Sequence, residues 1–90
     1  MPTSQEISDK VKKTLAEKAS IDVTDIIETG ELTKHPLYLD DTALGFIAIK
    51  LNTYVVTNST DESVSASEVR KSGLTVTGLI KLITTKIKGV

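Results

Sequence analysis

Asp40 and Asp41, followed directly by Thr42 and an apolar run, are the residues whose types and spacing first suggest chemistry. Paired carboxylates can transfer protons when they converge on one substrate. Adjacent residues point in different directions, however, and no other group is expected to converge on this pair. The pair is also typical of a helix start, because carboxylates accept hydrogen bonds from free amides and favour the positive end of the helix dipole. Two interpretations stay open: a helix cap, and a fixed negative charge at a recognition surface.

The sequence offers few other groups for catalysis or metal binding. It has no cysteine, which excludes disulfides, thiolate metal sites and thiol nucleophiles. Its single histidine, His35, precedes Pro36 and is expected to be an ordinary loop residue. We therefore expect neither an enzyme nor a metal site.

Length and composition predict one globular domain spanning residues 1–90. Hydrophobic residues make up 39% of the chain and charged residues 26%, a balance typical of soluble proteins. The net charge of -1 gives no basic field for nucleic acid. No apolar run reaches the length of about 18 residues that a membrane span needs, and the first residues lack the apolar stretch of a signal peptide. We expect a cytoplasmic monomer.

Two segments have clear helical patterns. Thr3 and Glu6 have the spacing of a capping box, and apolar residues follow on one face of residues 4–20. The last helix is expected from about residue 76 to residue 88, with Thr75 or Thr77 as its cap and late lysines at its negative end. The expected core residues of the two helices are Ile7, Val11, Leu15, Val76, Leu79, Ile80, Ile83 and Ile87.

The middle of the chain is less regular. Residues 21–40 form a long loop rich in aliphatic side chains, which we expect to lie across the core. Periodicity leaves helix and strand both open for residues 46–56, and the two preceding acids favour a helix to Asn52 or Tyr54. Residues 57–67 are expected to be a polar loop, and residues 67–71 a short helical turn that ends at Gly73.

Side chains on the middle helix are assigned to the core, and one structural alternative is kept. We expect Phe46, Ile47, Ile49 and Leu51 to be buried. Valine, isoleucine and threonine make up a third of the chain, and β-branched residues favour strands. A small mixed α/β fold is therefore the alternative to a helical bundle.

Two segments carry a resemblance to a known family. Residues 9–21, DKVKKTLAEKASI, are similar to the first helix of bacterial acyl carrier proteins, and residues 72–83, SGLTVTGLIKLI, resemble the last turn and helix of that family. The chain as a whole resembles an acyl carrier protein over most of residues 3–88. This resemblance implies an all-α fold, an acyl-carrier-like bundle of three main helices plus a short helical turn.

The resemblance also implies where the family's functional residue would be. Carriers attach 4′-phosphopantetheine to a serine in a D-S-L-type triplet, and here Asp40, Asp41 and Thr42 occupy that place, with Tyr38 replacing the usual glycine. An aspartate cannot form the phosphodiester, so no cofactor is expected. The resemblance then implies a docking module in fatty-acid, polyketide or related acyl metabolism. Its partners would be synthase, ligase or transferase proteins, recognised by Tyr38, Asp40, Asp41 and Thr42.

Two other functions remain open. The chain could be a working carrier modified at Thr42, in which case 4′-phosphopantetheine would be its cofactor. It could also be an unrelated small protein-interaction or regulatory domain, as its near-neutral charge and β-branched content would allow. In carriers the middle helix also lines the acyl cavity, which makes Phe46, Ile47, Ile49 and Leu51 the candidates for an acyl pocket.

Overall fold

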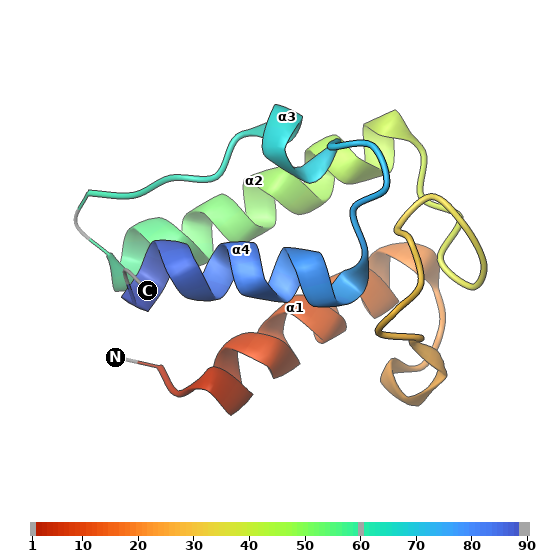
Figure 1. The fold of residues 1–90 in the computed structure, drawn as a ribbon, viewed down its shortest axis with the longest axis horizontal. Coiled ribbons are helices and arrows are strands. Elements are labelled where there is room, and N and C mark those ends of the chain that lie inside the picture. The colour runs from red at the N-terminus through yellow and green to blue at the C-terminus, as the bar shows by residue number, and fades with distance from the viewer. Residues whose placement is uncertain (1, 60, 89–90) are drawn as a thin grey trace.

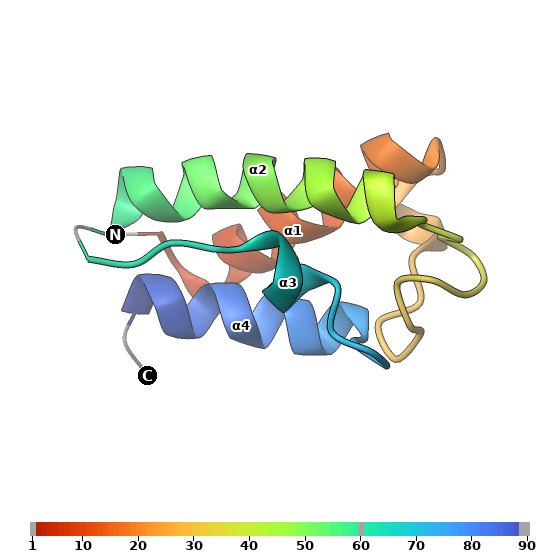
Figure 2. The same cartoon turned by 90° about the horizontal axis from the view of Figure 1, so that it is seen from above.

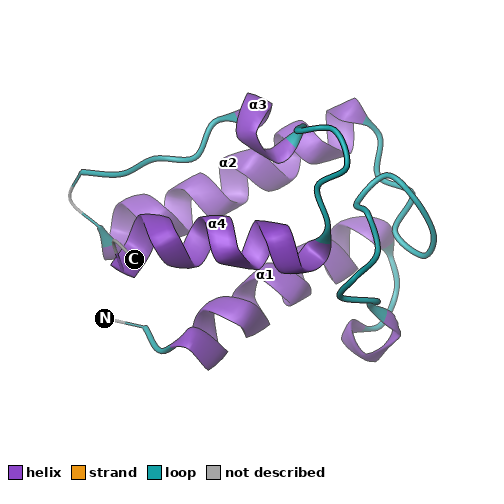
Figure 3. Cartoon of the chain, in the orientation of Figure 1, coloured by secondary structure: helices purple, strands orange, loops and turns teal. Residues whose placement is uncertain are grey.

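The computed structural model describes residues 2–59 and 61–88 and forms a bundle of helices in this part of the chain. The elements are α1 (Ser4–Ala19), the 3-10 helix η1 (Val23–Asp25), α2 (Asp41–Asn58), α3 (Ala66–Val69) and α4 (Val76–Lys88). The described residues contain no strand, only an isolated bridge between Glu31 and Thr75 (Figure 3). The all-α prediction is confirmed there, and the mixed α/β alternative is wrong.

α1 forms as its sequence predicts. The Thr3 hydroxyl accepts a hydrogen bond from the Glu6 amide, and the Glu6 carboxylate accepts one from the Thr3 amide, which completes the capping box. The helix buries Ile7, Val11 and Leu15 completely. It ends at Ala19, and the C-cap residue Ser20 has a left-handed backbone conformation (φ 59°) that cannot continue the helix.

α2 is longer than expected because helical spacing continues through its β-branched residues. Leu44, Ile47, Leu51 and Val55 are all buried on one face. The hydroxyl groups of threonines on the opposite side donate to carbonyls four residues earlier, as Thr57 does to Thr53 at 2.7 Å, so they are satisfied within a helix. The helix therefore includes residues 57 and 58, which we expected in the polar loop.

The prediction that all four apolar residues on the middle helix belong to the core is wrong for two of them. Ile47 and Leu51 are fully buried, but Phe46 is 46% exposed and Ile49 is 69% exposed. α2 carries apolar residues on two opposite faces, and only one face can contact the rest of the bundle. The other face remains at the surface.

α3 and α4 follow the predicted order with small shifts. α3 begins at Ala66 rather than Ser67, and it buries Val69. The polar segment before it is therefore shorter than the predicted loop of residues 57–67. Thr60, which belongs to that predicted loop, lies outside the described residues. Gly73 has a φ of 77°, the backbone region that favours glycine. Thr75 caps α4 by accepting a hydrogen bond from the Gly78 amide at 3.0 Å.

The helices pack with α2 and α4 running in the same direction and α1 running opposite to both (Figure 1). Residues 61–65, which lead into α3, run along the outside of the bundle and lie over α2 and α4 (Figure 1 and Figure 2). The long loop after α1 covers one end of the bundle. It buries Leu32, Leu37 and Leu39, as expected, whereas Val23 and Ile27 remain 45% exposed.

Candidate functional site

The two carboxylates at the start of α2 have different roles. Asp40 is the N-cap residue, and its Oδ1 accepts a hydrogen bond of 2.8 Å from the Ala43 amide. The helix-cap interpretation is therefore confirmed for Asp40. Asp41 is the first helical residue and is exposed, so its charge lies at the positive end of the helix.

The chain that leads into α2 holds this end in place. Leu37 and Leu39 are buried, at 4% and 5% exposure, and they anchor the residues between and after them. Tyr38, between these anchors, has a φ of 47° and is 70% exposed. Its ring meets the His35 ring edge to face, with centroids 5.8 Å apart. Tyr38, Asp40, Asp41 and Thr42 thus share one exposed end of the bundle.

Arg70 connects the end of α3 to the start of α2. Its Nη2 and Nε donate hydrogen bonds to the Asp41 carbonyl oxygen at 2.8 and 3.2 Å. Gly45 leaves room for the guanidinium, because a Cβ at that position would lie 2.7 Å from Arg70 Nη2. Sequence reasoning missed this contact, since Arg70 is separated from Asp41 by 29 positions.

A groove of about 650 Å³ runs between α2 and the segment that contains α3. Its apolar lining includes Phe46 and Ile49 from α2 and Val64 and Ala66 from the opposite wall. The remaining lining residues are Lys18, Thr42, Gly45, Ala48, Asn52, Thr53 and Arg70. The groove therefore contains two cationic side chains and no carboxylate.

The structure separates several residues that sequence reasoning grouped together. Thr42, Phe46 and Ile49 lie along the groove, whereas Ile47 and Leu51 face the core. Asp41 borders a neighbouring hollow of about 450 Å³, whose charged lining residues are Glu31, Lys34, Asp41, Arg70 and Lys71. The two candidate attachment residues therefore border different hollows.

Phe46 is held at the surface between two cations. The Nζ of Lys18 lies 4.5 Å from its ring centroid, and the Nζ of Lys50 lies 5.4 Å away. These distances are typical of cation–π contacts, which contribute about 0.5–1 kcal/mol at exposed sites. Lys18 belongs to α1, so its place beside the groove is a product of helix packing.

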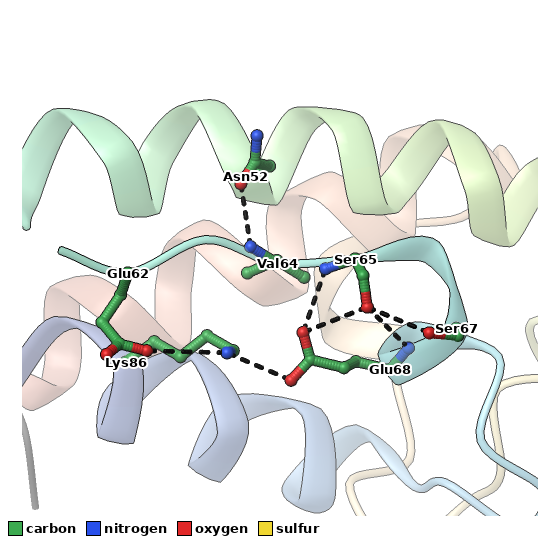
Figure 4. A network of polar contacts seen from close by, with 7 residues as sticks. All are labelled: Asn52, Glu62, Val64, Ser65, Ser67, Glu68 and Lys86. Carbon is green, nitrogen blue, oxygen red and sulfur yellow. Dashed lines mark hydrogen bonds and ion pairs between the residues drawn. The ribbon is translucent and has the colours of Figure 1, made fainter.

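The wall of the groove opposite α2 is fixed by polar contacts (Figure 4). Asn52 Oδ1 accepts a hydrogen bond of 2.8 Å from the Val64 amide, which ties this wall to α2. Val64 itself is buried. Next to it, Ser65 and Glu68 form a second capping box at the start of α3. The groove therefore has two defined sides.

Glu68 anchors α3 to α4 and is the ionisable group of this wall whose environment changes its pKa. A hydrogen bond from the Ser65 backbone amide, at 3.0 Å, lowers the pKa of Glu68 below its ordinary value of 4.5. Partial burial opposes this effect, and Lys86, whose Nζ lies 3.1 Å from Glu68 Oε2, adds to it. Lys86 also pairs with Glu62 at 3.7 Å.

No family model, curated protein or solved structure matches this chain. Residues 2–59 and 61–88 contain no group of three or more histidine, cysteine or acidic residues placed to hold a metal ion. Within the same ranges, no helix has the length and apolar content to cross a membrane. An open apolar groove with cationic edges is suited to binding another molecule.

Proposed function

We propose that this chain is an acyl-carrier-like docking module that acts without a 4′-phosphopantetheine arm. Its setting would be fatty-acid, polyketide or related acyl metabolism, and its partners would be synthase, ligase or transferase proteins. Recognition would use the exposed start of α2, where Tyr38, Asp40, Asp41 and Thr42 lie together.

The observation that carries this proposal is the position of Asp41. The resemblance aligns Asp41 with the serine that carriers modify, and Asp41 is the exposed first residue of a long helix that follows a long loop. A carboxylate at this position offers no hydroxyl to a phosphate. It does supply a permanent negative charge where a modified carrier would carry its phosphodiester.

The order of the elements also supports the proposal. A long first helix, a long loop, an acid-started second helix, a short helix and a final helix follow one another in the order that the resemblance implies. Phe46 and Ile49 lie on the open side of the second helix, where an acyl chain or a partner would meet them.

Intact-mass measurement after incubation with coenzyme A and a broad-specificity phosphopantetheinyl transferase tests this function. We expect the wild type to remain unmodified and the Asp41→Ser variant to gain the mass of the arm. Asp40→Ser is the matched control, because it removes the same charge, keeps a capping residue and places the serine one position earlier. It should remain unmodified.

The outcomes separate the possibilities. Modification of Asp41→Ser alone supports the fold relationship and the loss of the arm. Failure of Asp41→Ser, in a reaction that modifies a known carrier and with the variant's helical circular dichroism intact, counts against the carrier relationship. Equal modification of both variants would show that the alignment of Asp41 with the family's serine is wrong.

A working carrier modified at Thr42 is the second candidate, and one observation favours it. Thr42 is exposed on the first turn of α2, and it borders the apolar groove, as Asp41 does not. A mass gain by the wild type that Thr42→Ala abolishes would establish this second function and exclude the first.

A further inference from the structure

The exposed face of α2 carries three apolar residues and two threonines in a row that has the spacing of a coiled-coil seam. Thr42, Phe46, Ile49, Thr53 and Val56 are separated by four, three, four and three residues, and all five are exposed. This alternation keeps side chains on one line of a helix and is what a second helix needs for packing. We call these five residues the α2 seam. It extends for about 21 Å at 1.5 Å per residue.

The α2 seam is a second apolar face in addition to the one that forms the core. Ile49 is 69% exposed, Val56 54% and Phe46 46%, while the residues on the opposite side of the same helix are buried. Large apolar side chains gathered on one exposed line indicate an interaction surface. The core of this domain is complete without them.

The charges beside the α2 seam define the partner. Lys18 and Lys50 lie over the Phe46 ring, and Arg70 lines the adjoining groove. Within the described part of the chain, none of these three cations forms an ion pair, whereas Lys12, Lys34 and Lys86 each have a glutamate partner. Carboxylates on a partner helix would provide ion-pair partners for these three cations.

A second copy of this chain does not fit the same surface. A two-fold axis through the middle of the α2 seam, near Ile49, would place Lys50 of one copy against Lys50 of the other. Like charges at such flanking positions oppose pairing, and opposite charges favour it. The charge pattern therefore favours a different molecule.

We propose that the α2 seam binds an amphipathic helix of a partner protein, with apolar residues at heptad spacing and carboxylates on its flanks. The proposal names the partner chemistry of the docking surface and rests on the proposed docking function. It does not depend on whether Asp41 replaces a modified serine. Peptide binding and the transferase reaction can therefore fail separately.

A pair of designed peptides tests the proposal. Both peptides have three heptads with leucine at the a and d positions. One has glutamate at the e and g positions and the other has lysine there, so like charges keep each peptide from pairing with a second copy of itself. Binding is measured by fluorescence anisotropy of labelled peptide titrated with the full chain. We expect the glutamate peptide to bind at least tenfold more tightly than the lysine peptide.

Three variants locate the site. Ile49→Glu should weaken binding of the glutamate peptide at least tenfold, because it puts a charge in the middle of the α2 seam. Ile27→Glu, which adds the same charge at an exposed isoleucine in the loop, should bind as the wild type does. Lys18→Glu with Lys50→Glu should reverse the preference, so that the lysine peptide binds more tightly. Circular dichroism checks that each variant remains helical.

Several results would overturn the proposal. These are equal binding of the two peptides, no binding of the glutamate peptide at about 1 mM, or equal weakening by Ile49→Glu and Ile27→Glu. A dimer in sedimentation equilibrium that Ile49→Glu dissociates would assign the α2 seam to a second copy. Binding to anionic lipid vesicles without binding to the glutamate peptide would assign it to a membrane surface.

Discussion

At the scale of single residues, the contact among Arg70, Gly45 and Asp41 joins the two walls of the candidate site, as the hydrogen bond between Val64 and Asn52 also does. The guanidinium donates to the Asp41 carbonyl from a position 2.7 Å from where a Cβ of residue 45 would lie, so an alanine at that position would have to displace it. A glycine inside a helix is otherwise unfavourable by about 0.5–1 kcal/mol relative to alanine. The low helix propensity of Gly45 therefore lowers the free energy of unfolding, and the Arg70 hydrogen bonds that it accommodates raise it.

This opposition makes a testable prediction for a double-mutant cycle. In the Arg70→Ala background, Gly45→Ala should raise the free energy of unfolding by about 0.5–1 kcal/mol, the full gain in helix propensity. When Arg70 is present, the same substitution should hardly change the free energy of unfolding. Its gain in helix propensity is then offset, because the new Cβ displaces the Arg70 hydrogen bonds, which contribute about 0.5–1.5 kcal/mol. Urea denaturation of the four proteins measures both terms. An equal effect of Gly45→Ala in the two backgrounds would contradict it.

At the scale of elements, the two faces of α2 have different environments although their residues are similar. Ile47 and Ile49 have the same side chain, lie two positions apart in one helix, and are 0% and 69% exposed. The first belongs to the core and the second to the α2 seam. A comparison of these two isoleucines separates the effect of core packing from that of an exposed position on the same helix.

Truncation of each isoleucine provides the second prediction. Ile47→Ala should lower the free energy of unfolding by about 2–5 kcal/mol, because it leaves a cavity in a filled core. Ile49→Ala should change it by less than about 0.5 kcal/mol, since the residue is at the surface and alanine suits a helix. Urea denaturation followed by circular dichroism measures both. Comparable losses for the two variants would mean that both faces of α2 are packed.

The same helix shows how far the sequence could predict this molecule. α1 and α4 were predicted well, because each has apolar residues on one face and a capping residue before it. α2 has apolar residues on two faces, so its periodicity could not say which isoleucine faces inward. The cap at Asp40 was predictable from local sequence. The groove was not, because Lys18, Phe46 and Arg70 come from three separate segments that only tertiary packing brings together.

At the scale of the whole molecule, Lys86 connects α4 to the segment that forms the outer wall of the groove. It pairs with Glu68 on α3 and with Glu62 before it. The Glu68 pKa lies below its ordinary value of 4.5 in the folded state. Glu68 therefore contributes stability above pH 4.5, and this contribution is lost as the pH falls through the lower, folded-state pKa.

The third prediction concerns this pH dependence. At about pH 7, Glu68→Gln should be less stable than the wild type, because glutamine can retain the capping box but cannot pair with Lys86 as a charge. The difference should shrink as the pH falls below 4.5, where the wild-type carboxylate becomes protonated. Thermal unfolding across this range measures it. Glu17→Gln, which changes an exposed glutamate on α1, is the matched control and should show a smaller effect. A constant difference at every pH would contradict the assignment.

The long loop before α2 is tied to the start of α4 by hydrogen bonds between residues that are far apart in the chain. The Leu32 amide donates to Leu74 at 3.1 Å, the Val76 amide to Gly30 at 3.1 Å, and the Thr77 amide to Glu28 at 2.9 Å. Contacts between residues this far apart in the sequence cost conformational entropy, because the chain between them must first be closed into a loop. We therefore expect Tyr38, Asp40 and Asp41 to reach their final places late in folding. The proposed docking end would then be complete only on molecules whose last helix is already in place.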